Sequence, residues 1–213
     1  GIKNPTFTEL YGFFTGSFIG NPDLKPEESQ SWEIGWEQAL GSVSYSATYF
    51  EANLKNEIYT AFNPDFTSTA LNRVGESERS GVELAGRWQA LANLSLSGQA
   101  TLFDSQDDAG ADEIRVPEMT ASLSADWQVQ PDGLRIGLAL DHVGEQGDFD
   151  FGPFPSTLVE LDAYTLATLT AEYPLTERLA LTLRGENILG ETATDVFGYN
   201  GPGAGVFLGL KLR

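Results

Sequence analysis

The chain has 213 residues, a length that suits one domain or a large piece of one. It carries 12 basic and 31 acidic residues, which gives a formal net charge of −19, and it contains no cysteine. The charge disfavours nucleic acid as a partner, because Lys and Arg are needed to neutralise phosphates. The lack of cysteine excludes disulfides, thiolate nucleophiles and cysteine metal sites.

The chain opens with a segment, 1–29, in which Pro22 and Pro26 bracket a stretch that we expect to be rigid and extended. After it, apolar and polar residues alternate, as they do in strands with one apolar and one polar face. In 119–129, for example, one face carries Met119, Ala121, Leu123, Ala125, Trp127 and Val129, and the other carries Thr120, Ser122, Ser124, Asp126 and Gln128. The alternation predicts nine strands, at about 30–39, 43–59, 73–90, 94–103, 117–128, 134–146, 161–173, 178–189 and 204–213.

The lengths of these strands favour a membrane barrel. Most have ten residues or more, whereas strands of soluble proteins usually have about 5–6 residues and tilted membrane strands need about 9–11. No run of 18 apolar residues is present, so the sequence predicts no transmembrane helix. The polar face is rich in Ser, Thr and Gln, which suits a wet lumen, and Trp and Tyr residues gather near strand ends. A soluble β-sandwich remains the alternative at this point.

The connections alternate in length along the chain. Short links are expected at 40–42, 91–93, 130–133 and 174–177, and long links at about 60–72, 104–116, 147–160 and 190–203. Outer-membrane barrels have short periplasmic turns and long outer loops. We therefore expect the carboxy-terminus in the periplasm and residues 1–29 on the outer side.

The outer loops supply the candidate ligand contacts. Carboxylates, an aromatic ring and an amide could bind a ligand there, and these candidates are Asp104, Asp107, Asp108, Asp148, Asp150, Tyr199 and Asn200. The acidic residues within 104–113 have the oxygens that calcium prefers, but not the spacing of an EF-hand, so no metal site is predicted. The sole histidine, His142, follows Asp141 without any nucleophile motif, so no catalytic residue and no cofactor are predicted.

Three segments carry a family resemblance. Residues 20–29 read Gly-Asn-Pro-Asp-Leu-Lys-Pro-Glu-Glu-Ser, residues 79–83 read Arg-Ser-Gly-Val-Glu, and residues 186–190 read Glu-Asn-Ile-Leu-Gly. Together they resemble the TonB-dependent receptors of bacterial outer membranes, over essentially the whole chain. Two features depart from the family pattern: Ala193 stands where a Tyr is usual, and the chain ends Leu-Lys-Leu-Arg rather than on an aromatic residue.

The resemblance implies an all-β fold, an antiparallel transmembrane β-barrel. This chain would supply about nine carboxy-terminal strands of a barrel of about 22 strands. Residues 1–213 would form a single segment, with an outer loop segment at 1–29 and strands at 30–213, and the plug domain would lie outside the chain. The resemblance also implies a receptor that is embedded in outer-membrane lipid and is not an enzyme. This receptor would contact TonB through an amino-terminal region that is not in this chain.

Softer signals suggest the nutrient. Residues 195–203 resemble the last outer loop of the cobalamin receptors, and residues 173–176 resemble their last periplasmic turn. Acidic outer loops also disfavour an anionic ligand at long range. The sequence therefore ranks cobalamin first, a ferric siderophore or other iron complex second, and a diffusion porin as a further alternative.

Overall fold

The computed structural model describes residues 1–212 and is nearly all β. Nine of its strands within these residues have eight residues or more. They are β4 (Glu27–Leu40), β5 (Val43–Lys55), β8 (Glu76–Leu91), β9 (Leu94–Gln106), β10 (Met119–Gln128), β11 (Arg135–Val143), β14 (Tyr164–Pro174), β15 (Leu179–Glu186) and β16 (Gly205–Leu212). They neighbour one another in chain order in one sheet, and β1 (Ile2–Lys3) pairs with β4 at its edge. The predicted antiparallel barrel strands are thus confirmed, each within a few residues of its expected place.

The connections also follow the expected alternation. Only residues 41–42 and 92–93 separate β4 from β5 and β8 from β9, and residues 129–134 and 175–178 form the other two short links. The long links contain structure that the sequence analysis did not predict. The link after β5 holds the hairpin of β6 (Ile58–Phe62) and β7 (Ser68–Asn72), and the link after β11 holds the hairpin of β12 (Gln146–Asp150) and β13 (Thr157–Leu161).

Two further differences from the expected strands concern the end of β5 and the segment 1–29. The expected strand 43–59 stops at Lys55, because Asn56 adopts a left-handed backbone with φ 56°. Segment 1–29 contains the helix α1 (Phe7–Tyr11) and the short strands β2 (Phe13–Phe14) and β3 (Phe18–Ile19), which the sequence analysis did not predict. Arg213, the last residue of the final expected strand, lies outside the described residues. No helix within residues 1–212 is long and apolar enough to cross a membrane.

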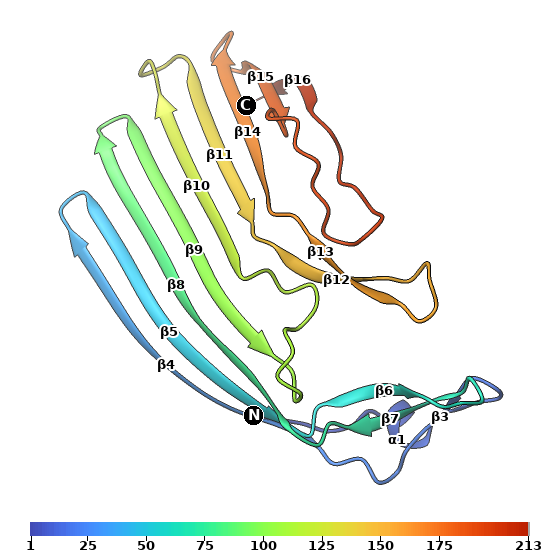
Figure 1. Cartoon of the computed structure of the whole chain (residues 1–213). Helices are drawn as coiled ribbons and strands as arrows, with labels where there is room; N and C mark the ends of the chain where they lie inside the picture. Colours follow the sequence, from blue (N-terminus) through green and yellow to red (C-terminus); the bar gives the residue numbers. More distant parts are fainter. Residues whose placement is uncertain (213) are drawn as a thin grey trace. The chain divides into compact units, whose positions relative to one another are not determined.

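The chain divides into two compact units, which are described separately below. Unit 1 comprises residues 1–33, 50–80 and 104–113, and unit 2 comprises residues 34–49, 81–103 and 114–213. In unit 2, β10, β11, β14, β15 and β16 run side by side, and the β12–β13 hairpin continues from the end of β11 (Figure 1).

The strand register of unit 2 sorts its side chains into apolar and polar rows. Leu123 on β10 pairs with Gly98 on β9 and Leu140 on β11, and the next residue, Ser124, pairs with Ser97 and Ala139. The apolar rows continue to the edge, where Leu181 pairs with Leu210 and Leu183 with Leu208. Paired residues share a face and successive residues alternate, so one face of the sheet is apolar and the other is polar.

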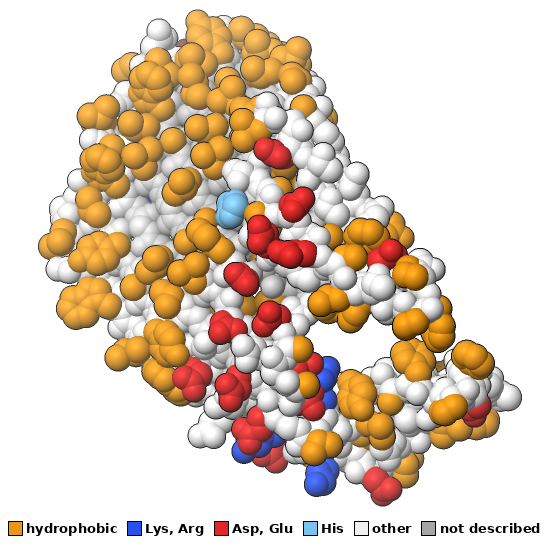
Figure 2. Space-filling model, in the orientation of Figure 1, with side chains coloured by type: hydrophobic (Ala, Val, Ile, Leu, Met, Phe, Trp, Pro, Cys, Tyr) orange, Lys and Arg blue, Asp and Glu red, His pale blue; other side chains and the backbone are white. Residues whose placement is uncertain are grey.

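The apolar face is exposed. Leu123 is 59% exposed and Leu210 is 67% exposed, whereas the buried apolar side chains of the described chain are mostly alanines. Figure 2 shows hydrophobic side chains spread over the strands of unit 2, with acidic side chains gathered toward β12. A row of exposed rings lies within five residues of the short links: Trp36, Trp88, Trp127 and Tyr173. An apolar band with an aromatic girdle is the surface that a barrel presents to lipid.

Unit 1 is built around a four-stranded sheet of order β2-β3-β7-β6 (Figure 1). The proline-containing block 20–29 docks on this sheet through hydrogen bonds between asparagine side chains and backbone groups. The Asn21 amide donates to the Ala70 carbonyl at 3.1 Å, and Asn72 holds Lys25 by accepting from its N–H at 2.8 Å and donating to its carbonyl at 3.0 Å. Leu24 between them is buried. This gives a physical role to the segment that carries the strongest resemblance.

Candidate functional site

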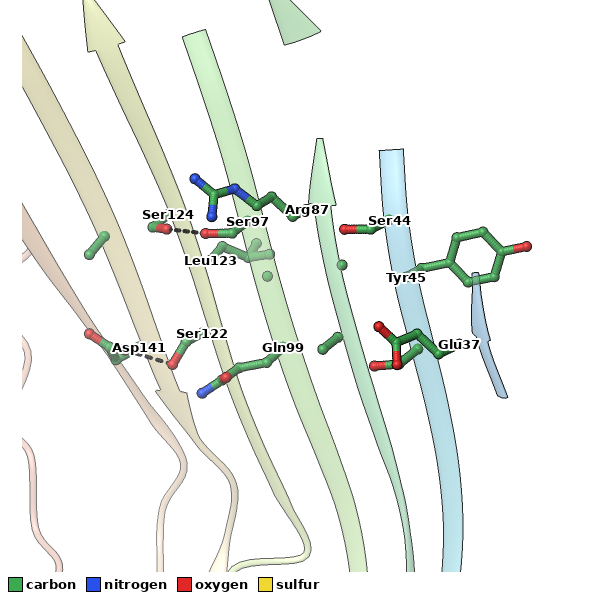
Figure 3. A pocket seen from close by; sticks show the side chains of 15 residues that line it. Glu37, Ser44, Tyr45, Arg87, Ser97, Gln99, Ser122, Leu123, Ser124 and Asp141 are labelled. Carbon is green, nitrogen blue, oxygen red and sulfur yellow. Dashed lines mark hydrogen bonds between the residues drawn. The ribbon is translucent and has the colours of Figure 1, made fainter. Parts of the chain in front are cut away.

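The polar face of unit 2 carries a hollow of about 460 Å³. Figure 3 shows its side chains on two levels. At one level Arg87 lies beside Ser97 and Ser124, whose hydroxyl oxygens are 2.7 Å apart, and at the other Ser122 donates to the Asp141 carboxylate at 2.8 Å. Small hydroxyls and a few charges make this face wettable, as the sequence analysis predicted for a lumen.

His142 does not form a catalytic pair with Asp141. Consecutive strand residues point to opposite faces, so Asp141 meets Ser122 on the polar face while His142 pairs with Ala121 on the apolar face. The His142 Nδ1 lies 2.9 Å from the Thr165 hydroxyl, near the end of β11. The histidine is therefore a strand-end residue on the apolar face.

Three long links of unit 2 converge on one carboxylate. Asp148 on β12 is fully buried, with 0% exposure. Its Oδ1 accepts from the Arg115 Nε and from the Phe149 N–H, each at 2.8 Å, and its Oδ2 accepts from the Phe197 N–H, also at 2.8 Å. Asp148 thus joins the link before β10, the β12–β13 hairpin and the link before β16.

These contacts explain how a buried charge is tolerated. A buried carboxylate is costly unless cations and hydrogen-bond donors compensate it. The Phe197 N–H and the Arg115 guanidinium hold the pKa of Asp148 below its usual range, although burial acts in the opposite direction. Arg115 has a left-handed backbone with φ 60°, and its N–H donates to the Gly147 carbonyl at 2.8 Å. The charged form of Asp148 is therefore the one that the loops stabilise.

The link 187–204 is ordered by further polar anchors. Asn187 is buried, and its amide donates to the carbonyls of Glu191 at 2.8 Å and Pro202 at 3.2 Å, while its Oδ1 accepts from the Glu191 N–H at 3.0 Å. The Tyr164 hydroxyl donates to the Asp195 carboxylate at 2.6 Å. Asn187 belongs to the Glu-Asn-Ile-Leu-Gly block, so this part of the resemblance also has a structural role.

In unit 1, three acidic residues of the 104–113 segment, Asp107, Asp108 and Glu113, also have internal partners. Asp107 closes a turn by accepting from the N–H groups of Ala109 and Ala111, at 2.9 and 3.0 Å. Asp108 forms an ion pair with Arg73, and the guanidinium lowers the pKa of that carboxyl. Arg73 also stacks over the Tyr59 ring, 5.3 Å from its centroid.

A second network of unit 1 centres on Arg79. Its Nε and Nη2 donate to the two oxygens of Glu113 at 3.0 and 2.7 Å, and Nη2 also lies 3.4 Å from Glu57. Ser105 donates to Glu113, and Ser77 donates to Glu57. The Arg79 guanidinium holds the pKa of Glu113 below its usual range. Every polar group of this network has a partner, so the network serves to order the segment.

The seven predicted ligand residues therefore separate into two classes. Asp107, Asp108 and Asp148 are engaged by the turn and by the arginines described above. Asp104 is exposed on β9, Asp150 caps a turn by accepting from the Gly152 N–H at 2.8 Å, and Tyr199 is 76% exposed. Asn200 is exposed and accepts from the Thr194 hydroxyl at 3.0 Å. Within unit 2, the structure connects Asp148 to the link that contains Tyr199 and Asn200.

Sequence reasoning missed the arginines that hold these acids. Arg73, Arg79 and Arg115 lie 22 to 35 residues from their carboxylate partners, so no local pattern connects them. Among residues 1–212, no group of three or more acidic or histidine side chains is placed to hold a metal ion.

Comparison with known proteins identifies the family to which this fold belongs. Residues 1–188 match the family described as TonB dependent receptor-like, beta-barrel. Among curated proteins, the vitamin B12 transporter BtuB of Vibrio cholerae is 26% identical over 200 residues, which cover 89% of this chain and 30% of that protein. The chain thus spans about 30% of the length of this relative.

Solved structures show the same fold. The pyoverdine receptor FpvA of Pseudomonas aeruginosa has a TM-score of 0.79 and 19% identity, covering 98% of this chain and 32% of that one. The ferric enterobactin receptor PfeA of Pseudomonas aeruginosa has a TM-score of 0.78 and 21% identity, covering 99% and 37%. The family comprises outer-membrane receptors and transporters of Gram-negative bacteria rather than enzymes. The chain belongs to the TonB-dependent receptor-like β-barrel family.

Proposed function

We propose that the intact protein takes up a scarce nutrient across the outer membrane, with energy supplied through TonB. TonB-dependent receptors bind nutrients such as cobalamin or siderophores. The two faces of unit 2 suit this role, because the apolar face can meet lipid and the polar face can line a wet lumen. The family match favours a receptor over the diffusion porin that the strand pattern alone left open.

Cobalamin is the first-ranked nutrient. The observation that carries this ranking is the 26% identity to vitamin B12 transporters, which extends over 89% of the chain. The second candidate is a ferric siderophore, because the similar solved structures include siderophore receptors. The acidic loops favour cobalamin less than the sequence suggested, since Asp108 and Asp148 are paired with arginines and project less charge.

We propose two roles for the candidate ligand residues. Tyr199, Asn200, Asp104 and Asp150 are exposed or half-exposed, so they are the candidates for direct contact with the nutrient. Asp107, Asp108 and Asp148 stabilise the conformation of the outer segments, and they affect nutrient binding only through that conformation. The proposed outer position of these segments rests on the alternation of short and long links.

The test is binding of cyanocobalamin and of ferric enterobactin to cells that carry the intact receptor. We expect cyanocobalamin to bind, and Tyr199→Ala to weaken it by about tenfold because an exposed aromatic contact is lost. Thr176→Ala, in a short link at the other end of the strands, is the matched control and should bind as the wild type does. Binding of ferric enterobactin alone would make the siderophore the nutrient, and binding of neither would contradict the proposed function.

A further inference from the structure

The apolar face of unit 2 carries a groove of about 410 Å³, distinct from the polar hollow of Figure 3. Its floor lies at two glycines, Gly86 on β8 and Gly98 on β9. Gly86 occupies a face with Leu84 and Trp88, which are 44% and 48% exposed. Because glycine has no side chain, the apolar surface is recessed at this point.

The two glycines differ in the space above them. A Cβ at Gly98 would lie 2.6 Å from the Leu123 Cδ2, so Leu123 already covers that position. A Cβ at Gly86 would meet nothing closer than the Ser44 carbonyl oxygen at 3.8 Å. The open part of the groove therefore lies over Gly86, and Leu123 forms one of its walls.

The opposite wall is held in place by a hydrogen bond. Tyr45 on β5 lines the groove, and its hydroxyl donates to the Gln38 Oε1 on β4 at 2.8 Å. In Figure 3 the Tyr45 ring points away from the side chains of the polar hollow. A tyrosine fixed at its hydroxyl end keeps its ring from collapsing into the recess, and thus the groove persists without an occupant from the described chain.

The groove extends from the middle of the apolar band toward the short links, since its lining includes Val43, the first residue of β5. Gly86 is five residues from Leu91, the last residue of β8. At about 3.3 Å per residue and a tilt of about 45°, this is roughly 12 Å of depth, or about half of a 25 Å apolar band. The groove is continuous with the surface that an outer-membrane barrel turns toward lipid.

We propose that this groove binds one acyl chain of a phospholipid from the leaflet on the short-link side. An apolar groove within the hydrocarbon region holds no water, and its walls lose dispersion contacts if it stays empty. A flexible, slender acyl chain fits such a recess. A chain held inside the groove would exchange with the surrounding lipid more slowly than the chains beside it. Leu96 and Leu140 add apolar walls, and the Tyr45 hydroxyl is already engaged by Gln38, so the recess suits an apolar occupant.

The experiment uses the intact receptor in vesicles of phosphatidylethanolamine and phosphatidylglycerol, with a trace of phosphatidylethanolamine that carries a diazirine on its acyl chain. After illumination, labelled peptides are measured by mass spectrometry. We expect the label on 81–91 and 94–103 to exceed that on 164–174 by about threefold or more, because a retained chain spends longer beside its groove. Gly86→Phe fills the groove and should reduce the excess to the level of 164–174.

Ala171→Phe is the matched control, because Ala171 also lies on the apolar face, between Ile136 and Leu183, but outside the groove. It should leave the labelling of 81–91 unchanged. Uniform labelling of all lipid-facing peptides, or an unchanged pattern in Gly86→Phe receptor that migrates as folded barrel, would overturn the proposal. Disulfide-linked dimers of Gly86→Cys receptor, with little lipid label, would also overturn it by assigning the groove to a second copy.

Discussion

The strands of unit 2 and the long links between them are organised by different rules. On β10, successive residues alternate between the two faces, so Leu123 lies in an apolar row and Ser124 in a polar one. In the long links, order depends on single residues such as Asp148, whose partners Arg115 and Phe197 are 33 and 49 residues away. The strands distribute their stability over many equivalent positions, whereas the long links concentrate it in a few polar anchors.

The largest expected effect tests the two faces of the strands. In the intact receptor folded into bilayers, Leu123→Arg should lower the free energy of unfolding by roughly 2–4 kcal/mol, because a charge then faces lipid near the middle of β10. Ser122→Arg, one residue away on the polar face, should cost much less. Denaturant titration of both variants measures the difference. Equal costs would contradict the assignment of the apolar face to lipid.

A smaller loss is expected from the Arg79 network of unit 1. Arg79→Met leaves Glu57 and Glu113 without their cation, and we expect about 1–2 kcal/mol of destabilisation, since the guanidinium is partly solvated. The same titration measures it. Arg178→Met is the control, because Arg178 is exposed in a short link and its side chain has no partner among the described residues. Similar losses for both variants would mean that the network contributes nothing specific.

The anchor at Asp148 should affect local order more than global stability. Asp148→Asn removes the charge that binds the Arg115 guanidinium and leaves one acceptor fewer for the backbone donors. We expect cleavage of the 190–203 link by added protease to become about tenfold faster, because proteolysis follows the population of the opened segment. Asp150→Asn is the control, since Asp150 accepts only from the nearby Gly152 N–H. Equal cleavage of the two variants would remove Asp148 as the common anchor.

The smallest effect is a pH dependence of the same link. Because the pKa of Asp148 is lowered in the folded state, its contribution is complete above the unfolded value of about 3.9 and is lost as the pH falls through the lower folded value. A spin label at Gly203 should therefore report constant mobility from neutral pH to about 5, and increased mobility only below about 4. The acid transition should be absent in Asp148→Asn. Loosening that begins near pH 6 would implicate another group.

Much of the fold could be predicted, because the information for it is local. The period of two placed all nine long strands and both faces, and the lengths of the links placed the turns. One missed element also had a local signal. Thr6 and Glu9 have the spacing of a capping box, and the structure shows both of its hydrogen bonds at the start of α1.

The rest could not be predicted from one sequence. The short strands β12 and β13 show no clear alternation, and in β12 Gly147 and Asp148 interrupt it. The role of Asp148 depends on contacts with residues far along the chain, and the residue looks like any other loop acid. Sequence reasoning identified these acids as candidates for ligand binding, but it had no way to see that arginines engage Asp108 and Asp148.

The β12–β13 hairpin has a consequence for engineering this protein. Its two strands pair only with each other in a sheet of their own, so their tip, 151–156, is not tied to the register of the long strands. An extra residue in β10 would move the following side chains to the opposite face, whereas lengthening a loop costs only about 0.6 kcal/mol per doubling. The tip is therefore a suitable place to graft an epitope or a peptide for display, provided that Asp148 at the base of the hairpin is kept.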